Sequence, residues 1–112
     1  MSERAQLPAA IAAYQEAHDR RDTEAALACF APHATVLDDG ATHVGTEQIR
    51  DWLDRAASEF TFTRTLTGVD RDGDDEVVVR NHLAGDFPGG TVDLQYRFQL
   101  ADGAILRLEI AP

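Results

Sequence analysis

The chain has 112 residues, which is enough for one domain with a single hydrophobic core, spanning residues 1–112, and too short for two. Its formal net charge of −10 at pH 7 argues against nucleic acid and membranes as partners, because nucleic acid and anionic lipid surfaces attract positively charged proteins. The cationic residues are all arginines and Cys29 is the only cysteine, which excludes Schiff-base and P-loop lysine chemistry, an internal disulfide and a cysteine zinc cluster.

Two helices are predicted near the N-terminus. A helix over residues 8–20 would have proline in its first turn, where proline is tolerated. Its core-facing side carries residues spaced by three or four positions: Leu7, Ile11, Tyr14 and His18. Asp22 is a suitable N-cap for a second, shorter helix that runs to Phe30 and is ended by Pro32. Tyr14 is therefore expected on the buried side of the first helix.

A short strand and a third helix follow. Residues 34–38 are short and partly β-branched, as is typical of a strand, and Asp39-Gly40 is a turn signal. Gly45 and Thr46 introduce the third helix, with Thr46 as the expected N-cap. The apolar stripe of this helix includes the following residues: Ile49, Trp52, Leu53, Ala56 and Phe60.

After Phe60 the hydrophobic period changes from 3.6 to 2, which predicts strands. Four consecutive strands are expected over residues 61–70, 76–85, 91–100 and 104–110, with Asp102-Gly103 closing the last hairpin. Helices followed by a run of strands indicate an α+β fold. We expect a cone-shaped, curved antiparallel sheet wrapped around the three N-terminal helices.

The strand over residues 76–85 has two possible registers. One face carries Asn81 with three apolar residues, and the other carries His82 with Arg80. Because burying an arginine is costly, we predict that the face with Asn81 points inward. In the opposite register His82 would point inward and could serve as an acid–base residue.

No cofactor or metal is expected. The chain has no glycine-rich dinucleotide fingerprint, and no spacing brings His18, His33 and His43 together as metal ligands. The first six residues lack the basic start and apolar stretch of a signal peptide, and no apolar run is long enough to cross a bilayer. These features predict a cytoplasmic protein.

This order of elements resembles the nuclear-transport-factor-2-like (NTF2-like) superfamily, including its SnoaL-like polyketide-cyclase and ketosteroid-isomerase branches. The likeness covers essentially the whole chain and lies in these segments: Tyr14, Asp22, Phe30-Ala31, Ala34-Thr35-Val36 with Asp38, Gly45-Thr46, Ile49-Arg50 and Tyr96-Arg97-Phe98. The resemblance implies a cone-shaped α+β barrel with an apolar pocket. It also implies a homodimer formed through the outer face of the sheet.

Residue by residue, the ketosteroid-isomerase pattern implies that Asp38 is a general base and Tyr14 an oxyanion donor. The second donor of that pattern falls at Leu94, which cannot donate a hydrogen bond, and Leu53 replaces an expected aromatic residue. Phe30, Trp52, Asn81 and Leu94 are the expected pocket-lining residues.

The leading hypothesis is a cofactor-independent acid–base enzyme that transfers a proton beside the carbonyl of an apolar small molecule. Cyclase, dehydratase or hydrolase chemistry on the same scaffold, and a non-catalytic binding or dimerisation module, are alternatives. Tyr14 could instead be an ordinary core residue, and Asp38 a turn former. The phase of the first strand bears on this: Asp38 points toward the pocket if Val36 is buried and toward water if Leu37 is buried.

Overall fold

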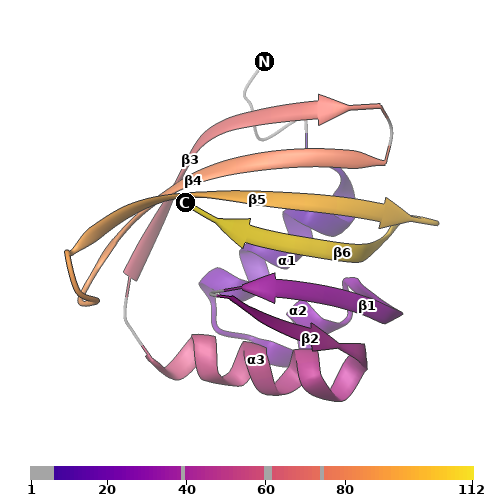
Figure 1. Ribbon diagram of the computed structural model, residues 1–112, viewed down its shortest axis with the longest axis horizontal. Helices are drawn as coiled ribbons and strands as arrows, with labels where there is room; N and C mark the ends of the chain where they lie inside the picture. Colours follow the sequence, from indigo (N-terminus) through magenta and orange to yellow (C-terminus); the bar gives the residue numbers. More distant parts are fainter. Residues whose placement is uncertain (1–6, 39, 60–61, 74) are drawn as a thin grey trace.

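Three helices pack against a six-stranded sheet in the computed structural model, which describes residues 7–38, 40–59, 62–73 and 75–112 (Figure 1). The helices are α1 (Ala9–Asp19), α2 (Thr23–Leu27) and α3 (Gly45–Glu59). The strands are β1 (Phe30–Asp38), β2 (Ala41–Val44), β3 (Phe62–Asp72), β4 (Glu76–Gly85), β5 (Thr91–Ala101) and β6 (Ala104–Ala111). The predicted α+β class is confirmed.

The sheet is curved and unclosed, with the strand order β2-β1-β6-β5-β4-β3. All neighbouring strands are antiparallel except β1 and β6, which are parallel. A register shift between Leu66 and Gly68 interrupts the pairing of β3 with β4, and such bulges bend a strand. In Figure 1, α1 and α2 lie behind the sheet and α3 runs beside β2.

Local sequence signals explain the helix ends. The Asp22 carboxylate accepts a hydrogen bond from the Ala25 backbone N–H at 3.2 Å, which confirms Asp22 as the N-cap of α2. The Val44 N–H donates to the Gln48 side chain at 2.8 Å, so the start of α3 is closed by a side chain that reaches back from the first turn. Gly45 has φ of 86°, a conformation that favours glycine, and α3 begins there rather than after Thr46.

Two predicted details of the first half are wrong. The helix α2 ends at Leu27, and Phe30 belongs to β1 because it pairs with Ile105 of β6. Residues 41–44 form an unpredicted strand, β2, whose Val44 pairs with Thr35. This strand has only 4 residues and no buried one, so it has no alternating pattern that the sequence could reveal.

The expected strand faces are confirmed. On β4 the residues pointing into the core are Val77, Val79, Asn81 and Leu83. Their neighbour His82 instead lies on the outer face, where its ring contacts the Asp93 carboxylate. On β1, Val36 is 0% exposed, so Asp38, two residues later, lies on the same inward face.

Several predicted details lie outside the described residues: the placement of Asp39 in the first turn, the side chains of Ala56 and Phe60 on the third helix, and Thr61 at the next strand. Among the residues that are described, no helix combines the length and apolar character needed to cross a bilayer.

Phe98 gives a test of this core. Its ring is fully buried on β5, so Phe98→Ala should lower the free energy of unfolding by about 3–5 kcal/mol, because it removes apolar contacts and leaves a cavity. Urea denaturation would measure the change. The neighbouring Gln99→Ala, on the exposed face of the same strand, should change stability by only about 0.5 kcal/mol. Equal losses in the two variants would contradict the assigned strand faces.

Candidate functional site

Asp38 ends β1 next to α3. Its backbone pairs with Ala41 of β2 and Ile110 of β6, which fixes the strand end on both sides. The Trp52 indole N–H donates a hydrogen bond to Asp38 Oδ2 at 3.0 Å. Trp52 reaches this position because the buried stripe of α3, which includes Ile49 and Leu53, packs against β1. The carboxylate is half-buried and held by a neutral donor.

Tyr14 lies in the centre of the interior. Its ring meets Phe30 and Phe98 edge-on, with ring centroids 5.5 and 5.8 Å away, and stacks on His18 at 5.7 Å. The residue is 1% exposed, and its hydroxyl has no hydrogen-bond partner within the described part of the chain. A buried phenol normally finds such a partner. Tyr14 therefore differs from an ordinary core tyrosine.

Burial raises the pKa of both tyrosines of the chain. Burial, with added contributions from Tyr96 and the Asp38 carboxylate, raises the pKa of Tyr14 well above its usual value of 10.0. Burial, followed by the Asp38 charge, raises the pKa of Tyr96 to about 12. Both phenols are hydrogen-bond donors at neutral pH. Since the Asp38 charge acts on both of them, the carboxylate and the two phenols belong to one electrostatic neighbourhood.

A second polar cluster, not predicted from the sequence, lies between α1, β3 and β4. The Arg64 guanidinium donates to the Asp19 carboxylate from Nε at 2.9 Å and from Nη2 at 2.6 Å. Its Nη1 donates to Asn81 Oδ1 at 3.1 Å. The Arg64 side chain is only 11% exposed. Strand alternation was the available signal, because Arg64 shares a face with the half-buried Phe62 and Leu66.

The expected pocket-lining residues are distributed around this interior. Phe30, Trp52 and Asn81 are buried, and Leu94 is half-buried beside the core. Leu94 of β5 is directly paired with Asn81 of β4. Phe30 contacts Tyr14 and Trp52 contacts Asp38, so two of the four touch the predicted catalytic pair.

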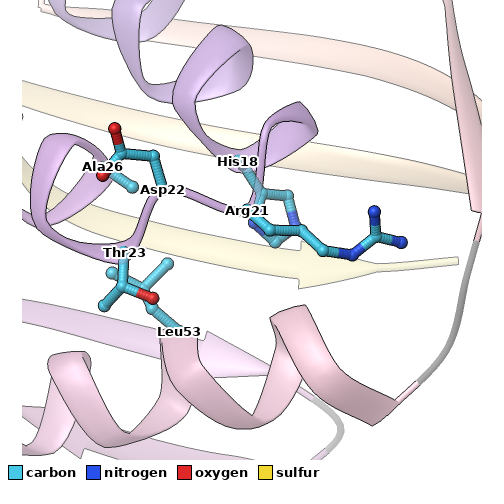
Figure 2. A pocket seen from close by; sticks show the side chains of 6 residues that line it. All are labelled: His18, Arg21, Asp22, Thr23, Ala26 and Leu53. Carbon is cyan, nitrogen blue, oxygen red and sulfur yellow. The ribbon is translucent and has the colours of Figure 1, made fainter.

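A shallow recess, too small to enclose a water molecule, lies at the surface beside His18. It is formed by the end of α1, the turn into α2, α2 itself and α3 (Figure 2). Its lining side chains are His18, Arg21, Asp22, Thr23, Ala26 and Leu53. Because His18 also stacks on Tyr14, the recess is separated from the phenol ring by one imidazole.

His18 lines this recess with its imidazole ring. Burial lowers the pKa of the imidazole from its usual 6.5, against the opposing effect of the Asp19 charge. Its ring lies between Tyr14 and Phe62, with a centroid distance of 6.2 Å to the latter. Among the described residues, no three His, Cys, Asp or Glu side chains are grouped so that they could hold a metal ion.

The fold and this interior define an α+β protein of the NTF2-like superfamily. The SnoaL-like domain model matches residues 11–108, and the chain therefore belongs to the SnoaL-like family. No curated protein sequence matches the chain.

Solved structures support the same assignment. A Sinorhizobium meliloti protein, provisionally described as a polyketide cyclase, is 36% identical with a TM-score of 0.92, covering 98% of this chain and 100% of that one. A Catenulispora acidiphila protein with a ketosteroid isomerase-like fold, in complex with trimethylamine, is 24% identical with a TM-score of 0.82, covering 94% and 85%. The Mycobacterium tuberculosis protein Rv0760c, in complex with estradiol-17β-hemisuccinate, is 19% identical with a TM-score of 0.78, covering 92% and 90%. The last two show a shared fold.

Alkaline titration tests the burial of the two phenols. In the unfolded chain both should ionise near the ordinary pKa of 10.0, whereas the folded protein should keep them protonated to higher pH. The unfolded state then loses protons first, so stability should fall as pH rises from 10 towards about 12. Tyrosinate absorbance, measured with and without denaturant, would follow this. Tyr14→Phe should remove one of the two delayed transitions, and ionisation of the folded protein at the ordinary pKa would show that the phenols are solvated.

Proposed function

We propose that the protein binds a largely apolar carbonyl compound and transfers a proton beside the carbonyl without a cofactor. The observation that carries this proposal is the buried, neutral and unpartnered Tyr14 phenol within electrostatic range of the Asp38 carboxylate. A donor for a developing oxyanion and a base for a carbon-bound proton are the two groups that enolisation needs.

Asp38 is the proposed base. Trp52 donates to Oδ2, and the other carboxylate oxygen is assigned the proton-accepting role. That oxygen takes a proton from the carbon next to the carbonyl. The electron pair of the broken C–H bond forms a new C=C bond, and the π pair of the carbonyl moves onto its oxygen. Asp38 then returns the proton to another carbon as the carbonyl re-forms. The indole hydrogen bond supports this role because it holds the carboxylate in one orientation.

Tyr14 is the proposed oxyanion donor. Its raised pKa means that the hydroxyl keeps its proton and donates a hydrogen bond while negative charge grows on the ligand oxygen. A fixed donor in a desolvated site stabilises that charge more than water does, because it needs no reorientation during the reaction. The rings of Phe30 and Phe98 support the role by fixing the plane of the phenol.

The proposed substrate is apolar apart from its carbonyl group. Phe30 and Trp52 are buried apolar residues and Leu94 packs against the same core, whereas Asn81 is a polar member of the set. Among structures with the same fold, Rv0760c is in complex with estradiol-17β-hemisuccinate, and a computationally designed protein is described as a 17-OHP binder. Cyclase, dehydratase and hydrolase reactions are alternative outcomes for the same pair of groups.

We further propose a cytoplasmic homodimer of single-domain chains that associate through the outer face of the sheet. The exposed polar side chains of β5, such as Gln95 and Arg97, lie on this face and offer a surface for contacts between copies. The acidic net charge of −10 is consistent with a small-molecule ligand rather than nucleic acid or membrane.

An isomerase assay on a β,γ-unsaturated ketosteroid tests the catalytic proposal. Asp38→Asn should lower kcat by about 10²–10⁴-fold, because an amide cannot accept the proton. Tyr14→Phe should lower kcat by about 10²–10³-fold through loss of the oxyanion donor. The ultraviolet absorbance of the conjugated product measures the rate. Asp93→Asn, an aspartate on the outer face, is the matched control and should retain the parent rate. Equal rates in all four proteins would reject the isomerase proposal.

The second candidate is a binding module without catalysis, favoured by Leu94, which carries no donor at the position that the ketosteroid-isomerase pattern assigns to one. In that case apolar ketones should raise the melting temperature of the parent and of Asp38→Asn equally, because a ligand selective for the folded state stabilises it. A thermal-shift series at increasing ketone concentration would measure this. Stabilisation without turnover would support binding alone, and the absence of any shift would reject this candidate too.

A further inference from the structure

Asn81 is fully buried, and only half of its amide is satisfied. Oδ1 accepts a hydrogen bond from Arg64, whereas Nδ2 has no partner among the described residues. Buried polar groups are almost always paired, so an unpaired amide nitrogen in the interior calls for an explanation. An acceptor atom on a ligand would satisfy it.

The orientation of this amide is set by chemistry. A guanidinium group has only donors, so the side of Asn81 that faces Arg64 must be its oxygen. Nδ2 is thereby directed away from Arg64. The two hydrogen bonds from Arg64 to Asp19 hold the guanidinium in the plane that a bidentate pair requires. The Asp19 carboxylate on α1 therefore fixes the Asn81 amide on β4, with Arg64 as the link between them.

The amide also belongs to the interior that contains the phenols. Asn81 is paired with Leu94, which is followed two residues later on the same face of β5 by Tyr96. The Arg64 charge acts on Tyr14 and on Tyr96, in both cases favouring the ionised phenol against the larger effect of burial. Arg64 therefore lies within electrostatic range of both hydroxyls while it bonds to Asn81.

We propose that Asn81 Nδ2 donates a hydrogen bond to a carbonyl oxygen of the ligand, and that Arg64 and Asp19 are positioning residues for this donor. The inference deepens the proposed function and rests on it for the chemical class of the ligand. It adds a specificity determinant: the site should favour a ketone over a hydrocarbon of the same shape. An apolar ligand would leave Nδ2 unpaired.

Two probes of matched shape test this, 2-acetylnaphthalene and 2-isopropylnaphthalene, with Kd measured by equilibrium dialysis. The parent protein should bind the ketone about tenfold more tightly than the hydrocarbon. Asn81→Leu should bring this ratio close to one while leaving the hydrocarbon Kd unchanged or lower. Arg64→Met should reduce the ratio and Arg64→Lys should partly restore it. Arg80→Met, which removes an ion-paired arginine from the outer face, should leave the ratio unchanged.

A direct readout does not depend on the folding of any variant. The NMR signal of the Asn81 side-chain NH₂ in the parent protein should move downfield with 2-acetylnaphthalene and stay in place with 2-isopropylnaphthalene. An unmoved signal, a parent ratio of one, or a ratio that survives Asn81→Leu would each overturn the inference. None of these measurements needs turnover, so failure of the Asp38 assay and failure of the Asn81 inference can be told apart.

Discussion

The hydrogen bond between Trp52 and Asp38 joins the helical layer to the sheet at the place where the candidate chemistry is located. One partner is fixed by the buried stripe of α3 and the other by the alternation of β1, in which Val36 is buried. If β1 were shifted by one residue, Leu37 would enter the core and the carboxylate would face water. Both the position of Asp38 and its effect on the two phenols therefore depend on the phase of a single strand.

Buried polar groups in the interior lower the stability of this small protein. Tyr14, Gln15 and Asn81 each bury polar atoms without a partner within the described part of the chain, and each such atom costs about 1–3 kcal/mol. Buried and incompletely paired groups gathered on one side of a curved sheet are the arrangement expected where stability is exchanged for ligand recognition.

Much of the fold and part of the candidate site could be predicted from the sequence, because apolar residues recur with the period of a helix or a strand. The stripe of α1 placed Tyr14, the cost of burying Arg80 placed Asn81 inward, and Asp22 marked a helix start. Strand β2 could not be predicted, since four residues with no buried member have no pattern. The Asp19–Arg64–Asn81 cluster was missed for a different reason: its members are 45 and 17 residues apart, and only the folded sheet brings them together. The rule that burying an arginine is costly placed Arg80 on the outer face correctly. Applied to Arg64, the same rule would have been wrong, because it does not consider the ion pair with Asp19.

The central place of β6 in the sheet affects how the molecule can form. This strand is the last one in the chain, yet it lies between β1 and β5 and aligns Ile110 with Asp38. During synthesis on the ribosome, β1 and β5 have no common neighbour until β6 has emerged. Until then the sheet consists of two separate parts, β2-β1 and β5-β4-β3. Pairing over such a long separation closes a large loop and is slow. The end of β1, which carries Asp38, therefore completes its pairing only after β6 has formed.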